Sequence, residues 1–176
     1  MAGIDQSLAF HPLNIAVLTV SDTRTIDDDS SGQTLADRIQ GAGHTLAARE
    51  ILRDDREDVR KQVRQWTDDK QIDVIITIGG TGLTGRDITV EAVTPLFDKT
   101  IDGFSTLFHL VSFDVIGTST VQSRACAGLA NNTLVFCLPG SPGAVKDGWD
   151  KILVLQLDSR HKPCNFVDLM PRFGET

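Results

Sequence analysis

"IITIGGTGLTGRDIT", residues 75–89, joins an apolar run to a glycine-rich loop. The run ends a predicted strand over residues 71–78, of the kind that is buried on both faces of a parallel sheet. Parallel strands are joined by right-handed crossovers, and their ligands bind beyond the carboxyl ends of the strands. The glycine loop lies at such an end. This stretch therefore predicts both an α/β fold and the place of its functional site.

The rest of the chain alternates between strand and helix patterns. Further strands are predicted at residues 14–20, at 45–52 and from residue 133 to the turn "PGSPG" at 139–143. Helices are predicted over residues 30–43, 54–70, 87–93, 104–129 with breaks, and 143–160. We therefore expect an α/β three-layer sandwich with a mainly parallel central sheet. It should form one domain over residues 14–167, between a flexible tail at 1–13 and a C-terminal tail at 168–176.

Composition narrows the class of ligand and the compartment. The 176 residues carry a net charge of −7, which disfavours a broad electrostatic grip on nucleic acid or an anionic membrane. The three cysteines form no C-x-x-C pair, so we expect structural thiols. The four histidines are scattered along the sequence, which does not indicate a cluster of metal ligands. The beginning of the chain lacks the apolar stretch of a signal peptide, and no stretch approaches a membrane span. We expect a cytoplasmic protein.

Two phosphate-binding fingerprints overlap in the glycine loop, and both fail on context. The G-x-G-x-x-G at residues 80–85 would require a following strand that ends in an acidic residue. The residues after the loop look helical, and no strand is predicted before Thr133, which disfavours an NAD-dependent oxidoreductase. A P-loop would require Lys and Ser or Thr where the sequence has Arg86 and Asp87.

The chemistry of the loop remains informative without those fingerprints. Gly79, Gly80 and Gly82 allow backbone N–H groups to converge on an anion, and Thr81 adds a hydroxyl group. Three other polar segments also follow predicted strands. They are Ser21-Asp22, Asp54-Asp55 and the turn at 139–143, in which Ser141 could donate to a phosphate.

Two carboxylates are the candidate metal ligands. Asp54 and Asp87 follow adjacent predicted strands, and together they could coordinate Mg²⁺ with the phosphate oxygens of a substrate. Each has a plainer interpretation: Asp54 and Asp55 are both placed to cap the following helix, and Asp87 could cap the helix after the glycine loop. The acidic run at 27–29 is interpreted as a solvated loop.

Several motifs occur in the order found in one protein family. They are "TVSD" at 19–22, D-x-SG ending at Gly32, the GGTG-x-x-x-RD-x-T element, Ser123-Arg124, "LPGSPGAV" at 138–145 and "RHKPCNF" at 160–166. Over residues 12–167 the chain resembles the molybdopterin-binding proteins of molybdenum cofactor biosynthesis, the family of MoaB, MogA and the gephyrin G domain. Its C-terminal third looks more like MoaB than MogA.

The resemblance implies a fold, an activity and a set of site residues. It implies the molybdopterin-binding domain fold in a homotrimer or homohexamer, and adenylylation of molybdopterin by ATP with Mg²⁺ and release of pyrophosphate. Asp54 and Asp87 become the catalytic and metal-binding residues, with Asp55 one place away from Asp54. The implied molybdopterin-binding residues are Ser21, Asp22, Gly79, Gly80, Thr81, Gly82, Pro139, Gly140 and Ser141. On physical grounds alone, Arg24, Arg86 and Lys146 are further candidate phosphate partners.

Two functions of different classes stay open. The first is an Mg²⁺-dependent molybdopterin adenylyltransferase, with molybdopterin and ATP as its partners and no nucleic acid or membrane. The second is a non-catalytic molybdopterin-binding or scaffolding protein, because some MoaB-like members bind the pterin without adenylylating it. The complete "GRDIT" element and both acidic positions favour the enzyme.

Overall fold

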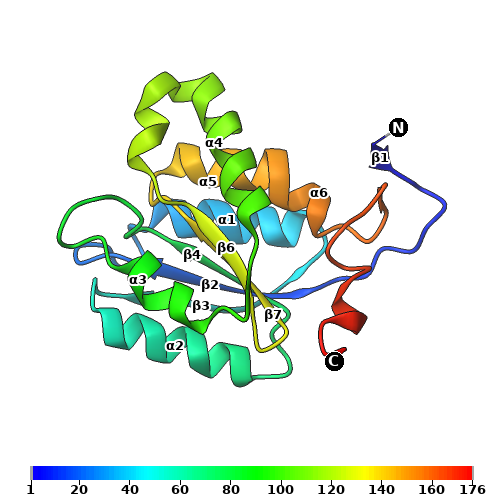
Figure 1. Cartoon of the computed structure of the whole chain (residues 1–176), viewed down its shortest axis with the longest axis horizontal. Helices are drawn as coiled ribbons and strands as arrows, with labels where there is room; N and C mark the ends of the chain where they lie inside the picture. The colour runs from blue at the N-terminus through cyan, green and yellow to red at the C-terminus, as the bar shows by residue number, and fades with distance from the viewer. Residues whose placement is uncertain (1, 176) are drawn as a thin grey trace.

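The computed structural model describes residues 2–175 and places a six-stranded sheet between two groups of helices (Figure 1). The strand order across the sheet is β3-β2-β4-β7-β6-β5. The strands are β2 (Asn14–Val20), β3 (Thr45–Leu52), β4 (Val74–Ile78), β5 (Lys99–Thr100), β6 (Cys126–Ala130) and β7 (Thr133–Leu138). β2, β3, β4 and β7 run parallel, whereas β6 is antiparallel to both β7 and β5. The expected α/β fold with a mainly parallel sheet is confirmed.

The helices form the two outer layers. They are α1 (Ser30–Gly41), α2 (Arg56–Asp68), α3 (Thr89–Val93), α4 (Asp102–Ile116), α5 (Pro142–Gly148) and α6 (Val154–Gln156), with short turns η1 (Thr94–Leu96), η2 (Gly117–Gln122), η3 (Trp149–Leu153) and η4 (Met170–Arg172). α2 and α3 cover one face of the sheet, and α1, α4 and α5 cover the other (Figure 1). Within residues 2–175, no helix has the length and apolar character to cross a bilayer.

The alternation of side chains along β2 explains why its sequence is apolar without a break. Ile15 and Val17 point to the α1 side, whereas Ala16 and Leu18 pack with Val63 of α2. All five are 0% exposed, so both faces of the strand lie in a core. The apolar runs recognised in the sequence are therefore the central strands, and polar residues are left to the strand ends.

The segment after α4 differs from its prediction. The helical pattern expected to residue 129 ends in α4 and η2, and residues 126–130 form β6 instead. Asn131 and Asn132 have φ angles of 46° and 67°, which suits a tight hairpin turn between β6 and β7. A Cβ atom at Gly128 would overlap the ring of Phe97, so the small residues of β6 serve close packing. A strand therefore does precede Thr133.

The N-terminal segment, expected to be a flexible tail, is bonded to residues 159–162 near the C-terminus. β1 (Gly3–Ile4) pairs with β8 (His161–Lys162) in a separate two-stranded sheet. The Asp5 N–H donates to the Arg160 carbonyl at 2.9 Å, and the His11 N–H donates to Ser159 Oγ at 2.9 Å. Beyond residue 167, Met170 and Phe173 pack against the core.

His44 connects the N-terminal segment to the core. Its side chain is buried, its Nδ1 atom accepts a hydrogen bond from the Leu13 N–H at 3.1 Å, and its ring lies 5.1 Å from that of Phe10. Burial lowers the pKa of His44 below its ordinary value of 6.5, against a smaller opposing effect of Asp158. The folded protein therefore favours the neutral imidazole.

We expect His44 to make the fold sensitive to mild acid. Because the pKa is lower in the folded state, the stabilisation is complete above the unfolded pKa and is lost as the pH falls towards the folded pKa. Between about pH 7.5 and about pH 5.5, the melting temperature of the wild type should fall more than that of His44→Asn. Thermal melts of both proteins across this range test the expectation. Equal pH dependence would contradict it, and His109→Asn serves as the control for a partly buried histidine elsewhere.

Candidate functional site

The glycine loop reverses the chain at the carboxyl end of β4. Gly79 and Gly80 have φ angles of 98° and 64°, a region that side chains disfavour. A Cβ atom at Gly79 would overlap the carbonyl oxygen of Val20, and one at Gly80 would overlap Thr89 Oγ1. Only glycine fits at these two positions, and the reversal brings the loop against the end of β2.

The carbonyl groups of residues 79–82 are all bound by the protein. The Thr89 hydroxyl donates to the Gly79 carbonyl at 2.7 Å, and the Thr89 N–H donates to the Gly80 carbonyl at 3.0 Å. The Arg124 N–H donates to the Thr81 carbonyl at 2.9 Å, and the Arg124 Nε atom donates to the Gly82 carbonyl at 2.8 Å. Within the part of the chain that the structure describes, no acceptor binds the N–H groups of Gly80 or Thr81. The loop therefore directs its acceptors inward and leaves donors for an anion.

Arg124 is the residue whose role the sequence analysis missed. Besides its bonds to the glycine loop, its Nη2 atom donates to the Asp87 carbonyl at 3.2 Å, and its guanidinium forms an ion pair with Glu91. The signal was present as Ser123-Arg124, but nothing local indicates that this arginine binds backbone carbonyl groups 42 residues away.

Asp87 does not cap the helix that follows it. α3 begins at Thr89, and the residue at its N-cap position, Ile88, makes no side-chain hydrogen bond to the helix. The Asp87 carboxylate instead accepts from the Thr84 N–H at 2.8 Å and from the Thr84 hydroxyl at 2.7 Å. Burial tends to raise the pKa of Asp87, but hydrogen bonds from Thr84 and Gly82 outweigh it and lower the pKa. The carboxylate is thus kept ionised beside the glycine loop.

Asp54 and Asp55 divide two roles between them. Asp55 is the N-cap of α2 and accepts hydrogen bonds from the first N–H groups of that helix. Asp54 is not used in this way, and its Oδ1 atom would lie 3.4 Å from a Cβ atom at Gly80. Burial and the nearby charge of Asp22 raise the pKa of Asp54. Asp54 is therefore the carboxylate that faces the glycine loop.

The two carboxylates lie next to different glycines of the loop. Asp54 lies at Gly80, Asp87 lies at Gly82, and the charge of Asp87 contributes to raising the pKa of Asp54. Among residues 2–175, no group of three or more His, Cys, Asp or Glu side chains is arranged to hold a metal ion. Mg²⁺ is commonly held by one or two carboxylates together with substrate phosphates, which matches this donor set.

Asp22 and Arg86 bind each other rather than standing free. The Arg86 Nε and Nη2 atoms donate to the Asp22 carboxylate at 2.9 Å and 2.6 Å. This pairing lowers the pKa of Asp22, and it joins the segment after β2 to the glycine loop. Arg86 is two-thirds exposed, at 66%, so a bound phosphate could still compete for it. Lys146, the other expected phosphate partner, is exposed on α5.

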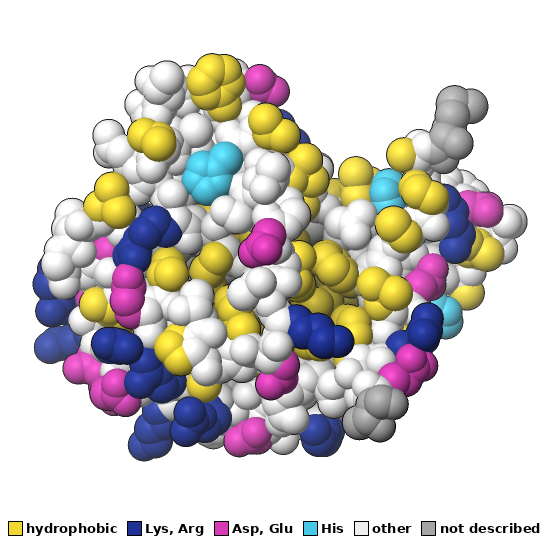
Figure 2. Space-filling view, viewed as in Figure 1, with side chains coloured by type: hydrophobic (Ala, Val, Ile, Leu, Met, Phe, Trp, Pro, Cys, Tyr) yellow, Lys and Arg dark blue, Asp and Glu magenta, His cyan; other side chains and the backbone are white. Residues whose placement is uncertain are grey.

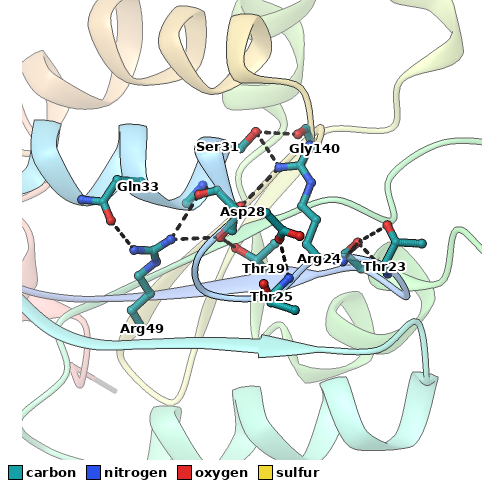
Figure 3. Close-up of polar contacts among 12 residues, drawn as sticks. Thr19, Thr23, Arg24, Thr25, Asp28, Ser31, Gln33, Arg49 and Gly140 are labelled. Atoms are coloured by element: carbon teal, nitrogen blue, oxygen red, sulfur yellow. Dashed lines mark hydrogen bonds and ion pairs between the residues drawn. The ribbon is translucent and has the colours of Figure 1, made fainter.

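A buried ion cluster holds the segment after β2 against the turn after β7 (Figure 3). Asp29 is 2% exposed, accepts from the Thr19 hydroxyl at 2.7 Å, and pairs with Arg24 and Arg49 at 3.2 Å and 3.3 Å. Arg24 also donates to Ser31, whose hydroxyl donates to the carbonyl group of residue 140 at 2.8 Å. Asp29 was wrongly expected in a solvated run, and Arg24 is committed to structure instead of being free for phosphate.

Most of the predicted binding residues line two pockets that share Gly140 and Ser141 of the turn at 139–141. A pocket of about 260 Å³ lies between the glycine loop, this turn and α4 with η2; its lining includes residues 80–82, Asp87 and Thr120. A second pocket, of about 390 Å³, is lined by Ser21 and Arg24. The turn itself is anchored because Ser141 caps α5 through the Ala144 N–H, at 3.2 Å. Asp22, Asp54 and Gly79 lie outside both linings.

Comparison with known proteins identifies the family and supports the fold. Residues 16–159 match the family described as "Probable molybdopterin binding domain". The chain is 47% identical over 160 residues to molybdenum cofactor biosynthesis protein B of Escherichia coli (strain K12), covering 91% of this chain and 94% of that protein. A crystal structure of a molybdenum cofactor biosynthesis protein B is similar, with a TM-score of 0.82, 40% identity, and coverage of 85% and 94%. The tungsten cofactor synthesizing protein MoaB from Pyrococcus furiosus has a TM-score of 0.72 at 35% identity, with coverage of 81% and 91%.

We expect Arg124→Ala to loosen the glycine loop. The variant loses the side-chain hydrogen bonds to the Gly82 and Asp87 carbonyl groups. A hydrogen bond from a charged group contributes at most about 3 kcal/mol to stability. Urea unfolding should show a loss of about 1–3 kcal/mol, and hydrogen exchange of residues 79–87 should accelerate.

Arg86→Ala is the matched control. It removes an arginine that belongs to the glycine loop and whose ion pair with Asp22 is exposed. That substitution should cost no more than about 1 kcal/mol. If the two variants unfolded alike and exchanged alike, Arg124 would not be the anchor of the loop.

Proposed function

The chain belongs to the molybdopterin-binding domain family of molybdenum cofactor biosynthesis, and from this premise we propose that it binds molybdopterin and adenylylates it with ATP and Mg²⁺. The observation that carries the proposal is the glycine loop, in which two N–H groups lack a partner among residues 2–175 and a carboxylate lies on each side. Such a loop suits a phosphate group together with its counter-ion.

The pocket beside the loop suits the pterin. It combines N–H and hydroxyl groups of residues 80–82 with the apolar side chains of α4, including Phe108 and Ile116. A planar, polar ring with a phosphate arm would meet both kinds of surface there. We propose that residues 79–82, Pro139, Gly140 and Ser141 bind molybdopterin, together with Asp22 and with Ser21, which lines the second pocket.

Adenylylation would require positioning and charge stabilisation, without a covalent enzyme intermediate. An oxygen of the molybdopterin phosphate attacks the α-phosphorus of ATP, and the bond to the leaving pyrophosphate breaks. The N–H groups of Gly80 and Thr81 would orient the attacking phosphate. Asp54 and Asp87 would hold Mg²⁺, which when bound supplies positive charge to the phosphates.

The electrostatic state of the two carboxylates supports these roles. Asp87 is held ionised by hydrogen bonds within its own loop, so it offers a fixed negative charge. Asp54 is partly desolvated and repelled by Asp22, so a cation at this place would relieve an unfavourable charge. The cytoplasm is the proposed compartment, supported by three free cysteines.

Asp87→Asn should separate binding from chemistry. The amide keeps the size of the side chain and can still accept from the Thr84 N–H, but it loses the charge proposed to hold Mg²⁺. We expect formation of adenylylated molybdopterin to fall by at least about 100-fold while molybdopterin affinity changes little. Mass detection of the product after incubation with molybdopterin, ATP and Mg²⁺ gives the rate, and fluorescence titration gives the affinity.

Asp55→Asn is the matched control for Asp54→Asn. Asp55 caps α2 and asparagine also caps helices well, so this variant should remain active, whereas Asp54→Asn should not. A wild-type protein that binds molybdopterin yet forms no product with ATP under any divalent metal would instead establish the non-catalytic binding function.

We also propose that the chain assembles into a homotrimer or homohexamer through α4. This helix protrudes from the body of the molecule, and hydrophobic side chains gather over it (Figure 2). Leu110 and Phe113 are 61% and 54% exposed there, and Ile116 and Val121 of η2 are exposed as well. Exposed apolar surface of this kind marks an interface.

Charged residues on α4 should therefore lower the mass of the particle in solution. Leu110→Glu with Phe113→Glu would place two carboxylates in the proposed interface, at a cost of several kcal/mol. Sedimentation velocity should show a multimer for the wild type and a monomer for the double variant. Ile26→Glu, at a side chain 52% exposed in another loop, should leave the multimer intact. A monomeric wild type would rule out the assembly.

A further inference from the structure

Two cysteines lie directly opposite each other on neighbouring strands. Cys126 of β6 and Cys137 of β7 are partners in the antiparallel register. Directly opposed residues in such a pair have Cα atoms about 4.5 or 5.5 Å apart and side chains on the same face. A disulfide requires Cα atoms about 4.4–6.8 Å apart, so either type of pairing meets the requirement.

The two side chains share one environment. Cys137 is 0% exposed and belongs to the core cluster on the α2 side of the sheet, and Cys126 packs against the same cluster. Cys126 is only partly buried, so it is the more accessible residue of the two. In the structure both are thiols.

The thiols also differ in reactivity. Hydrogen bonding with Cys137 lowers the pKa of Cys126 despite its burial, and the charge of Arg124 acts in the same direction. The same hydrogen bond, together with burial, raises the pKa of Cys137. An accessible, more acidic thiol beside a protected one is the usual arrangement of an attacking and a resolving cysteine.

We propose that Cys126 and Cys137 are a modification site, at which a peroxide produces a reversible intramolecular disulfide in the folded protein. The Cys126 sulfur attacks one peroxide oxygen, the O–O bond breaks, and water leaves, which gives a sulfenic acid on Cys126. The Cys137 sulfur then attacks the Cys126 sulfur, the S–O bond breaks, and a second water leaves. Two thiols and one hydrogen peroxide thus become one disulfide and two waters.

The place of the pair connects it to the candidate site. Cys126 follows two residues after Arg124, which anchors the glycine loop. A covalent bond between β6 and β7 would form next to that anchor. The third cysteine, Cys164, is exposed in a C-terminal segment and has no part in this pairing.

The test uses the full chain with Cys164→Ser, which removes the exposed thiol that could link two molecules. After treatment of the folded protein with hydrogen peroxide, we expect an intact mass lower by two hydrogen atoms and loss of both remaining thiols to alkylation under denaturing conditions. Peptide mapping should find residues 126 and 137 in one cross-linked species, and dithiothreitol should restore both thiols.

Two single variants in this background complete the test. Cys126→Ser and Cys137→Ala should not lose two hydrogen atoms, and Cys137→Ala should retain a sulfenic acid that dimedone labels. Because a substitution in the core can impair folding, each variant is compared by circular dichroism before oxidation. The proposal is overturned if both thiols of the Cys164→Ser protein are still alkylated after peroxide, or if the cross-link forms only in denaturant.

Discussion

The reversal of the chain at Gly79 and Gly80 constrains everything else at this edge of the sheet. A strand buried on both faces ends there, and the loop must turn while in contact with the Val20 carbonyl group of the neighbouring strand. Left-handed glycine conformations achieve the turn, but they leave a row of carbonyl groups that need donors. Thr89 and Arg124 supply those donors from two later segments. Because these bonds fix the loop through its carbonyl groups, the N–H groups of Gly80 and Thr81 remain without an acceptor among residues 2–175.

This constraint also explains why the site is assembled from distant parts of the sequence. Arg124 reaches the loop only because the segment after η2 returns to the sheet as β6, antiparallel to β7. The turn at 139–141 reaches it because β4 and β7 are neighbours, and Gly140 approaches Gly79 so closely that a Cβ atom would lie 3.2 Å from its Cα. The buried charge of Asp29 holds that turn through Arg24 and Ser31. The fold brings these residues together, and hydrogen bonds to backbone groups fix them.

Sequence patterns predicted well those elements whose structure is decided by local burial and backbone propensity. The apolar run at 14–20 became a strand with the expected bounds, because burial on both faces leaves an unbroken signal. The segment at 45–52 also has the expected bounds, although it is the edge strand β3 and none of its residues is fully buried. β6 was missed because its small residues resemble a helix, and because the Asn131-Asn132 turn was not recognised. Asp54 could not be told from Asp55 in sequence, since both occupy positions where a cap is favourable. The roles of Arg124 and Asp29 depend on tertiary contacts, which cannot be predicted from the periodicity of the sequence.

The three acidic residues near the loop show how similar side chains acquire different roles. Asp22 is neutralised by Arg86, and Asp87 is satisfied by hydrogen bonds within its own loop. At Asp54 the compensation is weaker: burial and the charge of Asp22 outweigh the opposing effects of a backbone hydrogen bond and of Arg86, and raise its pKa. A carboxylate in that condition either takes up a proton or attracts a cation. Asp87 stays ionised at the same loop, so a divalent cation bound by both carboxylates would offset their charges and could still coordinate phosphate oxygens. The unfavourable state of Asp54 therefore supports the proposal that this loop binds a cation together with a phosphate.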